Sequence, residues 1–402
     1  MTGFAATGPH VLRRMNAAAV LGALREAPGG TGRVADLMGA TGLSRPAVTR
    51  ALNLLAEAAI VDFTEDTAAR VGRPAVRARF RAERGHVAGI DVGPHKVLVM
   101  LADLAGTVRA QRRVSVPRGL DGGSLADLLR TALIEAAGAA GVVPEELWAV
   151  GVGTPGVVDR ERGEVVLAPS IPGWAGTSLL AELRAWLGCP VHIDNDVNLA
   201  VVAERWRGET SENLLFVQWG ERIGSGIVID GKPYRGAHSA SGELGFLDLV
   251  TPIDAEAPHV ADGLGSFERL VGAGAILRLA VERCGEELRR ALTAGGDLAP
   301  LFAAAEAGDA AASGVVETIA ARFARGLAAQ LLVLDPGLVV VGGGVSRAGE
   351  PLFEAVRGHL RRMLLVPVEL RVSALREEGV ALGAVRMALD GAERRLSASL
   401  LS

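Results

Sequence analysis

Residues 91–96 combine a carboxylate, a glycine and a lysine in a short turn of a kind that can hold a phosphate. The run reads Asp91-Val92-Gly93-Pro94-His95-Lys96, between apolar segments that we expect to form two strands. Such a turn presents backbone N–H groups and one carboxylate to a nucleotide, and it favours small residues because the backbone must approach the phosphate closely. Pro94 removes one N–H donor and His95 adds bulk, so the turn keeps the frame of a nucleotide loop but disturbs the part that touches nucleotide.

Three further glycine-rich turns, at 151–156, 220–226 and 342–344, adjoin predicted strands. Each alone is weak, because glycine turns are often purely structural. Together with the turn at 91–96, on a pattern of two lobes, the three turns are a more specific signal.

Polar residues cluster near other predicted strand ends, where Asn195 and Asp196 follow one strand and Glu243 follows a loop. An Asn-Asp pair and a glutamate that face one cleft can hydrogen-bond the hydroxyl groups of a sugar. The alternative for an isolated Asn-Asp pair is a helix cap or a turn.

The first eighty residues predict a different chemistry, that of nucleic-acid binding. Helices are expected at 12–27, 34–41 and 45–55, with Gly42 in the turn before the last helix and Ser44 as its N-cap. Its inward face is Val48, Leu52 and Leu55. This is the layout of a helix-turn-helix, whose last helix enters the major groove.

Polar and basic residues of the last helix, and of a wing formed by strands at 60–64 and 71–80, are the candidate DNA contacts. They are Ser44, Arg45, Thr49, Arg50, Asn53, Arg70 and Arg73. Residues 1–84 hold 12 basic and 7 acidic residues, although the whole chain has a net charge of -4. A basic head on an acidic body suggests a polyanionic partner; the alternative is a plain three-helix bundle with solvated arginines.

The composition indicates which broad class of protein this chain belongs to. The 402 residues are 49% hydrophobic and 22% charged, which is typical of a globular protein with a sizeable core. We see neither an apolar run of the roughly 18–20 residues that span a bilayer nor a secretory signal. Cys189 and Cys284 are far apart, so we predict no disulfide framework, no metal cluster and a cytoplasmic protein.

Alternating strands and helices follow from residue 85 and predict an α/β body. Strands are expected at 86–91, 97–103, 108–116, 148–152, 164–167, 190–194, 213–219, 223–229, 338–341 and 368–372. Helices are expected at 123–140, 177–187, near 265–283, at 286–293, 315–334 and 350–362, and from about 379. We expect a DNA-binding domain at 1–84 and a two-lobed domain at 85–402. We place the lobe boundary near 196–212, a range that includes the polar connector at 205–212.

The chain resembles the repressor, open-reading-frame and kinase (ROK) family, in its regulator branch, over nearly its whole length. The matching segments are 91–93, 151–159 (GVGTPGVVD), 171–174, 194–198 (DNDVN), 234–237, 242–245, 334–336 and 342–344. The resemblance implies an N-terminal winged helix-turn-helix followed by a two-lobed actin-like ATPase (sugar kinase-like) fold, with the C-terminal helix returning to the first lobe.

The resemblance also implies an effector site in the cleft. Its residues are Gly153, Thr154, Asn195, Asp196, Glu243 and Glu268. In the kinases of the family, the aspartate at the position of Asp196 is the general base that activates the sugar hydroxyl.

Three departures separate this chain from the family's kinases; two of them indicate a vestigial nucleotide site, and the third concerns the family's zinc site. Pro94 and His95 interrupt the first phosphate loop, and Glu221 with Arg222 interrupts the second; a carboxylate there repels a triphosphate unless a metal or Arg222 offsets it. The remaining nucleotide-site positions are Asp91, Gly93, Lys96, Gly220, Gly224 and Gly343. Phe246 replaces the family's zinc-binding histidine and no cysteine follows, so we predict no thiolate zinc site, and we expect His259 to be a solvated loop residue.

We therefore predict a transcriptional regulator, a repressor that binds double-stranded operator DNA as a homodimer or homotetramer. A small carbohydrate-like effector controls it, without a cofactor, a membrane or kinase activity. The alternatives are an ATP-dependent sugar kinase that also binds DNA, and a constitutive DNA-binding protein whose body serves only for oligomerisation.

Overall fold

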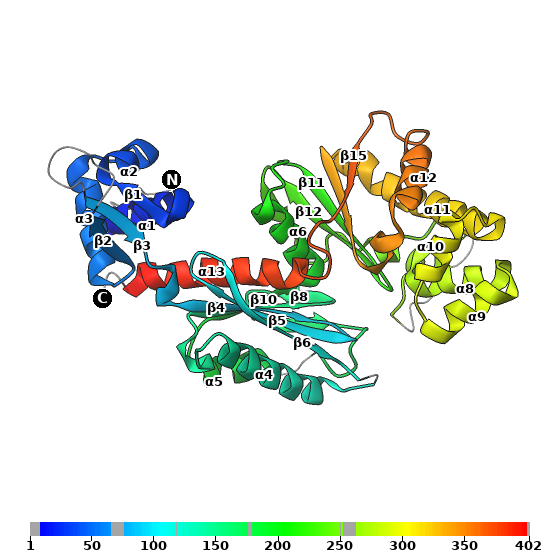
Figure 1. Ribbon diagram of the computed structural model, residues 1–402, viewed down its shortest axis with the longest axis horizontal. Helices are drawn as coiled ribbons and strands as arrows, with labels where there is room; N and C mark the ends of the chain where they lie inside the picture. The colour runs from blue at the N-terminus through cyan, green and yellow to red at the C-terminus, as the bar shows by residue number, and fades with distance from the viewer. Residues whose placement is uncertain are drawn as a thin grey trace.

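The computed structural model describes residues 9–65, 76–117, 119–175, 179–249, 251 and 263–399. It contains a small N-terminal domain and two lobes, and the long C-terminal helix runs from the lobes to the N-terminal domain (Figure 1). The fold class predicted from the sequence is confirmed.

The N-terminal domain is a winged helix. Its helices are α1 (Pro9–Glu26), α2 (Val34–Thr41) and α3 (Arg45–Glu57), and its strands are β1 (Thr31–Arg33), β2 (Val61–Glu65) and β3 (Val76–Phe80). The three strands form one antiparallel sheet in the order β1-β3-β2. Val48, Leu52 and Leu55 of α3 are fully buried against α1 and α2, as their spacing predicts.

The first lobe is built on a five-stranded sheet in the order β10-β7-β4-β5-β6. The strands are β4 (His86–Val92), β5 (Lys96–Asp103), β6 (Val108–Ser115), β7 (Ala149–Thr154) and β10 (Val191–Asn195). Helices α4 (Gly122–Ala139) and α5 (Leu179–Leu187) cover one face, and α13 (Gly379–Ser399) lies on the other (Figure 1). A separate hairpin joins β8 (Val157–Asp159) to β9 (Glu164–Leu167).

The second lobe repeats this sheet plan, in the order β13-β12-β11-β14-β15. Its strands are β11 (Leu214–Trp219), β12 (Ile223–Ile229), β13 (Lys232–Tyr234), β14 (Leu338–Gly342) and β15 (Glu369–Val372). In both sheets the lobe's first long strand is central, pairs with the next strand as an antiparallel hairpin, and has a parallel neighbour on its other side. The turn between β4 and β5 in the first sheet therefore occupies the same position as the turn between β11 and β12 in the second sheet.

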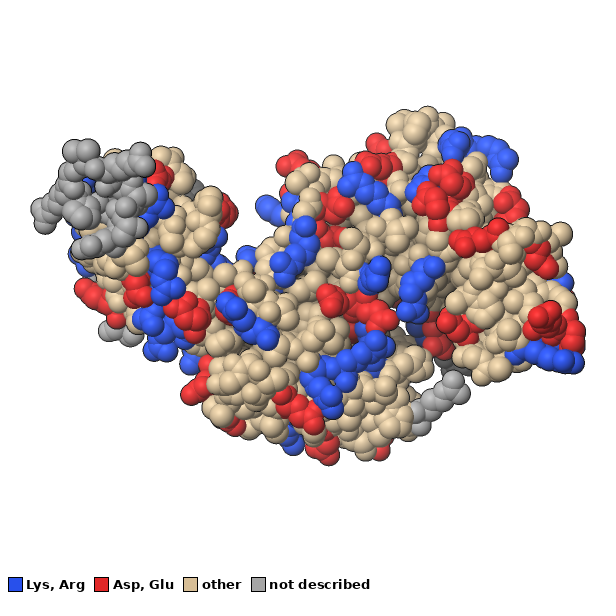
Figure 2. All heavy atoms as spheres, in the orientation of Figure 1, with Lys and Arg blue, Asp and Glu red and all other residues tan. Residues whose placement is uncertain are grey.

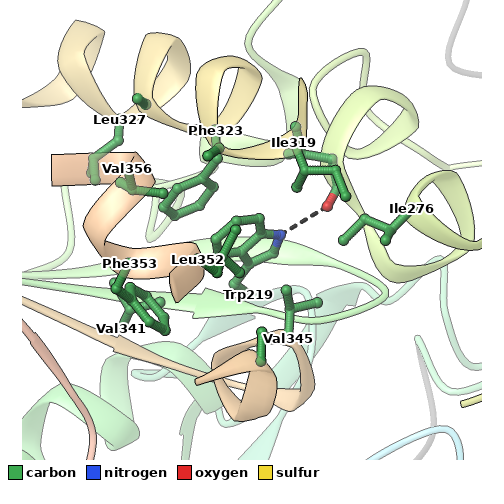
Figure 3. Close-up of a cluster of buried hydrophobic side chains, with 14 of the residues drawn as sticks. Trp219, Ile276, Ile319, Phe323, Leu327, Val341, Val345, Leu352, Phe353 and Val356 are labelled. Atoms are coloured by element: carbon green, nitrogen blue, oxygen red, sulfur yellow. Dashed lines mark hydrogen bonds between the residues drawn. The ribbon is translucent and has the colours of Figure 1, made fainter. Parts of the chain in front are cut away.

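Helices cover both faces of the second sheet. One face packs on α6 (Asp196–Arg207) and α13; the other packs on a helical layer. That layer comprises α7 (Glu268–Val271), α8 (Ala273–Arg283), α9 (Glu286–Gly295), α10 (Ala299–Glu306), α11 (Ala310–Leu334) and α12 (Glu350–Leu360). In its core Trp219 stacks on Phe323, with 3.6 Å between the ring centroids, and the Trp219 indole donates to the Val271 carbonyl (Figure 3).

Glycines let α13 pack against its neighbours at backbone distance. A Cβ at Gly151 of β7 would lie 2.1 Å from the Ala384 carbonyl oxygen, and a Cβ at Gly383 would lie 1.9 Å from the Leu199 carbonyl oxygen. No residue with a side chain fits at either position without moving the backbone. Helix α13 is thereby fixed to the first-lobe sheet and to α6.

The far end of α13 carries the winged helix. Leu389, Ala392 and Leu396 share one buried cluster with the winged-helix core. Arg25 of α1 pairs with Glu393 and donates a hydrogen bond of 2.6 Å to the Leu104 carbonyl of the first lobe. The winged helix is therefore packed on the body rather than only tethered to it.

Most predicted elements are present, and the differences have local causes. The helix expected near 265–283 is divided at Gly272, which has extended backbone angles and lies where a Cβ would be 2.7 Å from the Glu221 carbonyl oxygen. The helix expected from residue 315 begins at Ala310, because the Asp309 side chain accepts a hydrogen bond from the Ala312 N–H. The short strands β1, β8 and β13 were not predicted.

Among the described residues, no helix combines the length and the apolar character that crossing a membrane requires. On the face shown in Figure 2, acidic and basic side chains are interspersed over both lobes, and a notch separates the winged helix from the second lobe.

Candidate functional site

A cavity of about 100 Å³ lies between the two lobes, and we call it the interlobe pocket. One wall is the end of β10 and the start of α6; the other is formed by β12 and the segment after β13. Asn195, Asp196, Glu243 and Glu268, four of the predicted effector residues, line it together. Three carboxylates in one small cavity are strong acceptors for the hydroxyl groups of a ligand.

Asp196 has the most altered acidity in the pocket. Removal from water, followed by the nearby Asp91 carboxylate and opposed by a hydrogen bond from the Val197 N–H, raises its pKa from 3.8 to about 7. A carboxyl group with this pKa can accept or release a proton near neutral pH, which suits a general base or an adaptable hydrogen-bonding group.

Asn195 is a helix cap, as one of the two alternatives in the sequence had it, and it also lines the pocket. Its Oδ1 caps α6 by accepting from the N–H groups of Val197 and Asn198 at 2.9 and 3.1 Å, and its Nδ2 donates to the Gly156 carbonyl. The cap fixes the side chain at the pocket wall, where one amide hydrogen is still available.

The two pocket glutamates are held differently. Burial, and then the charge of Glu268, raises the pKa of Glu243. Glu268 instead accepts from the N–H groups of Ile223 and Gly265 at 2.8 and 2.9 Å and pairs with Arg222 at 3.4 Å. Glu243 is therefore the freer acceptor, and Glu268 joins chain segments around the pocket.

Arg222 does not take the role considered for it from the sequence. Its guanidinium donates to the Gly263 carbonyl and pairs with Glu268, so it lines the interlobe pocket instead of offsetting Glu221. The half-buried pair with Glu268 draws the arginine inward. Phe246, at the family's histidine position, also lines the pocket and is 42% exposed.

Gly153 and Thr154 lie behind the pocket and do not line it. A Cβ at Gly153 would meet Val380 of α13 and Leu199 of α6. Thr154 is fully buried, and its hydroxyl accepts a hydrogen bond of 2.7 Å from the Trp174 indole. The neighbouring residues Pro155 and Gly156 form that wall of the pocket instead, so an effector contact of Gly153 or Thr154 stays a prediction that the position of these two residues does not favour.

The turns β4–β5 and β11–β12 face each other across the lobes and meet at the two substituted positions. His95 Nε2 and Glu221 Oε2 are 2.9 Å apart, and both side chains are more than half exposed. Lys96 contacts the buried Asp91 at 3.2 Å and donates to the Glu377 carbonyl at 3.1 Å. Burial raises the pKa of Asp91, an effect that Lys96 opposes.

The glycines predicted for the nucleotide site have different neighbours. The Gly93 N–H donates to the Lys96 carbonyl, and Gly220 lies near Gly344 in the second lobe. Gly224 lines the interlobe pocket. Gly343 has a φ of +90°, and a Cβ there would lie 2.4 Å from the Trp219 carbonyl oxygen.

The polar face of α3 is open to solvent. The predicted contacts Ser44, Arg45, Thr49, Arg50 and Asn53 are all exposed. Ser44 has the extended backbone of an N-cap, but its side chain makes no capping hydrogen bond. The predicted wing contacts Arg70 and Arg73, like His259, lie outside the described residues.

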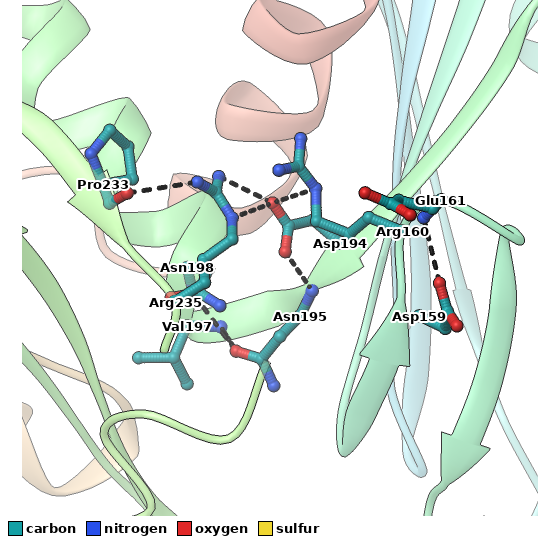
Figure 4. Close-up of polar contacts among 9 residues, drawn as sticks. All are labelled: Asp159, Arg160, Glu161, Asp194, Asn195, Val197, Asn198, Pro233 and Arg235. Atoms are coloured by element: carbon teal, nitrogen blue, oxygen red, sulfur yellow. Dashed lines mark hydrogen bonds and ion pairs between the residues drawn. The ribbon is translucent and has the colours of Figure 1, made fainter. Parts of the chain in front are cut away.

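Asp194, the first residue of the segment 194–198 (DNDVN), is a buried carboxylate beside the interlobe pocket, and the sequence did not predict a role for it. Asp194 is 1% exposed and accepts from Arg235 of the second lobe at 2.8 and 2.9 Å and from Arg160 of the first lobe at 3.2 Å (Figure 4). Because consecutive residues of a strand point to opposite faces, Asp194 and Asn195 serve opposite sides of β10. Arg235 is separated from Asp194 by 41 residues, so only the fold reveals the pair.

These features define a class of protein: a two-lobed actin-like sugar kinase fold with a winged helix-turn-helix at its N-terminus. The sequence profile of the ROK family matches residues 87–390, and that of the IclR helix-turn-helix domain matches residues 15–63. The chain belongs to the ROK family and has the domain organisation of its transcriptional regulators.

Relatives of the chain include both regulators and kinases. A xylose repressor from Caldicellulosiruptor bescii is 26% identical over 330 residues, which are 79% of this chain and 82% of that protein. A glucokinase from Halalkalibacterium halodurans is 28% identical over 307 residues, 73% of this chain and 92% of that protein. The crystal structure of a ROK family transcriptional regulator, a homologue of the Escherichia coli MLC protein, has the same fold, with a TM-score of 0.77, 20% identity, and coverage of 98% of this chain and 99% of that one.

Proposed function

We propose that this protein is a transcriptional repressor that binds operator DNA through α3, responds to a carbohydrate-like effector in the interlobe pocket, and has no kinase activity. The observation that carries the proposal is the contact of His95 with Glu221. It joins the two turns that must open toward a nucleotide, while Lys96 is already engaged by Asp91 and Glu377. The exposed α3 supplies a function that needs no phosphoryl transfer.

The effector chemistry follows from the pocket. Acidic side chains accept hydrogen bonds from hydroxyl groups, and the side chain of Phe246 offers an apolar patch to a sugar ring or a substituent. The xylose repressor among the relatives supports a sugar as ligand.

Signal transfer in this proposal uses lobe closure. A ligand that contacts Asp196 on one wall and Glu243 on the other favours the closed arrangement. In a homodimer, or a homotetramer built from such pairs, closure changes the separation of two winged helices that occupy two half-sites of an operator. Light scattering of the purified chain tests the oligomeric state.

The DNA-binding part is tested by Arg50→Ala in an operator-binding assay. Arg50 is exposed and has no hydrogen-bond or ion-pair partner among the described residues, so its removal leaves the fold intact. We expect operator affinity to fall about tenfold or more and base preference to relax, by roughly 1–3 kcal/mol. Arg325→Ala, at an exposed position of α11, is the control. Unchanged affinity and specificity in Arg50→Ala would refute this placement of the DNA-reading helix.

The second candidate is an ATP-dependent sugar kinase that also binds DNA. The pKa of about 7 at Asp196 favours it, since this value suits a general base, and the glucokinase relative agrees. A coupled ADP-release assay over a panel of sugars separates the candidates. We expect no turnover; sustained turnover that disappears in Asp196→Asn would establish the kinase instead.

A further inference from the structure

A second and larger cavity, of about 440 Å³, lies on the opposite side of β10 from the interlobe pocket. It also adjoins both lobes, because Arg160 and Asp194 come from the first lobe and Pro233 and Arg235 from the second, with α6 and α13 between them. We call it the arginine cavity. Its charged lining residues are Arg160, Arg205, Arg235, Arg386, Arg394, Asp194 and Asp390.

The arginines of this cavity outnumber the carboxylates that neutralise them. Asp194 serves both Arg160 and Arg235, and Asp390 pairs with Arg386 at 2.6 Å. Arg205 donates to the Ser211 carbonyl. Arg394 is exposed and has no hydrogen-bond or ion-pair partner in the part of the chain that the structure describes. The cavity therefore holds an excess of positive charge.

Arg160 lies close enough to other arginines of the cavity to be affected by their charge. Burial lowers the pKa of Arg160, Asp194 opposes this, and the charges of Arg235 and Arg394 lower the pKa further. A bound anion would relieve this repulsion, and guanidinium groups are suited to phosphate because their planar donors match its oxygens in pairs.

The other residues that line the cavity indicate what kind of molecule carries the anionic group. Leu199, Val202, Trp206 and Met387 provide apolar surface beside the arginines. A volume of about 440 Å³ is that of a small-molecule site. Duplex DNA is a poor fit, because Arg235 is only 20% exposed and lies inside a concavity.

We propose that the arginine cavity is a second ligand site, which binds a phosphorylated small metabolite between the two lobes. Arg394 and Arg386 of α13 contact the phosphate together with the outward donors of Arg160 and Arg235, and the apolar wall receives the remainder of the molecule. The site does not depend on the proposed repressor function.

The position of the site couples it to the interlobe pocket, a consequence that does rest on the proposed function. The carboxylate of Asp194 also accepts the Asn195 N–H at 2.9 Å, and the Arg235 carbonyl accepts the Ser241 N–H, two residues before Glu243. A ligand that shifts Arg235 therefore shifts groups on both walls of the interlobe pocket. Binding at the two sites is then linked, and the linkage is reciprocal.

The test is calorimetric titration of the full chain with inorganic pyrophosphate, a compact multivalent anion. We expect saturable binding with one site per chain. Arg386→Gln combined with Arg394→Gln should weaken it about tenfold or more, since each charge-assisted hydrogen bond lost is worth roughly that factor. The control Arg325→Gln, at an exposed position of α11, should bind as the unmodified chain does. The exposed single substitution Arg394→Glu supplies the answer if the double variant does not fold.

Three results would overturn the proposal. Absence of saturable pyrophosphate binding would exclude an anion site, and equal weakening by Arg325→Gln would mean non-specific attraction. Loss of operator affinity in Arg394→Glu, with pyrophosphate affinity unchanged, would assign the arginine to the DNA backbone instead.

Discussion

The interlobe pocket and the arginine cavity adjoin the same end of β10 but carry opposite charge. The pocket gathers Asp196, Glu243 and Glu268 around one arginine, whereas the cavity gathers five arginines around two aspartates. Two neighbouring carboxylates lie one on each side: burial, and then the charge of Asp91, raises the pKa of Asp196 to about 7, while Asp194 forms ion pairs with Arg160 and Arg235. Asp194 lies near the end of β10, whereas Asp196 begins α6, and this change of element places one carboxylate among arginines and the other in the pocket, where burial raises its pKa.

The largest expected effect on stability comes from removing the charge of Asp194. Asp194→Asn leaves Arg160 and Arg235 without their shared partner at a position that is 1% exposed. We expect the apparent free energy of unfolding to fall by about 2–4 kcal/mol, measured by urea denaturation. The control is Asp390→Asn in the same cavity, where a pair with Arg386 that is far more exposed than Asp194 should change stability by less than about 1 kcal/mol. Equal effects of the two substitutions would show that the ion pairs of Asp194 do not stabilise the contact between the lobes.

Asp196→Asn should instead raise the free energy of unfolding, and the size of this gain should depend on pH. The pKa of Asp196 is raised in the folded protein, so its stabilising contribution is fully present below its unfolded value of 3.8 and is lost as pH rises through about 7. The variant should therefore match the unmodified chain near pH 4 and exceed it at pH 8, by about 1–3 kcal/mol once solvent screening at the pocket edge is allowed for. Thermal unfolding across this range measures the difference, with the exposed Asp127→Asn as control. A stability gain that does not depend on pH would contradict the raised pKa.

Ligand recognition in the interlobe pocket should depend on Glu243 more than on Glu268. Glu243→Gln removes the freer acceptor, so we expect sugar affinity to fall by about 1–2 kcal/mol and effector-induced release of DNA to disappear, while operator binding persists. A thermal-shift screen of sugars and sugar phosphates identifies the ligand to be used. Loss of operator binding in Glu243→Gln would indicate a structural role instead.

The smallest energetic effect is expected at His95 and Glu221. Both side chains are more than 60% exposed, and such pairs contribute about 0–1 kcal/mol. A double-mutant cycle with His95→Gln and Glu221→Gln should give a coupling at the low end of that range. The combined variant Pro94→Gly, His95→Thr and Glu221→Thr should nevertheless gain ATP affinity, measured by calorimetry, because it restores donors and removes a repulsive charge. Unchanged nucleotide affinity would mean that other residues close the site.

Periodic patterns and ordered motifs were sufficient to predict most of the fold. The burial of Val48, Leu52 and Leu55 follows from their spacing on α3, which also leaves Arg45, Thr49 and Arg50 outside. The order of the glycine turns and of the Asn-Asp pair predicted the two-lobed body. Asn195, Asp196, Glu243 and Glu268 lie around one cavity as their motif positions imply.

Contacts between distant segments could not be predicted in the same way. The orientation of Arg222 depends on Glu268, 46 residues away, and the burial of Thr154 depends on Trp174. The arginine cavity had one local signal, because Arg386, Asp390 and Arg394 are four residues apart on one face of α13. That spacing alone does not distinguish a solvated helix face from the wall of a cavity.

The backbone-to-backbone packing of α13 has a mechanical consequence. Because α13 meets β7 and α6 at backbone distance and shares a buried cluster with the winged helix, we expect the winged helix, α13 and the first lobe to move as one rigid unit. The second-lobe sheet packs on α6 and α13 through apolar side chains, and we expect this contact to be the one that changes when the second lobe moves. Fluorophores placed on the winged helix and the first lobe would then keep a constant energy transfer when ligand binds, while a pair placed across the lobes would respond. In a dimer of the proposed repressor, a ligand would then change how the two protomers are arranged relative to each other. The internal structure of each winged helix would stay the same.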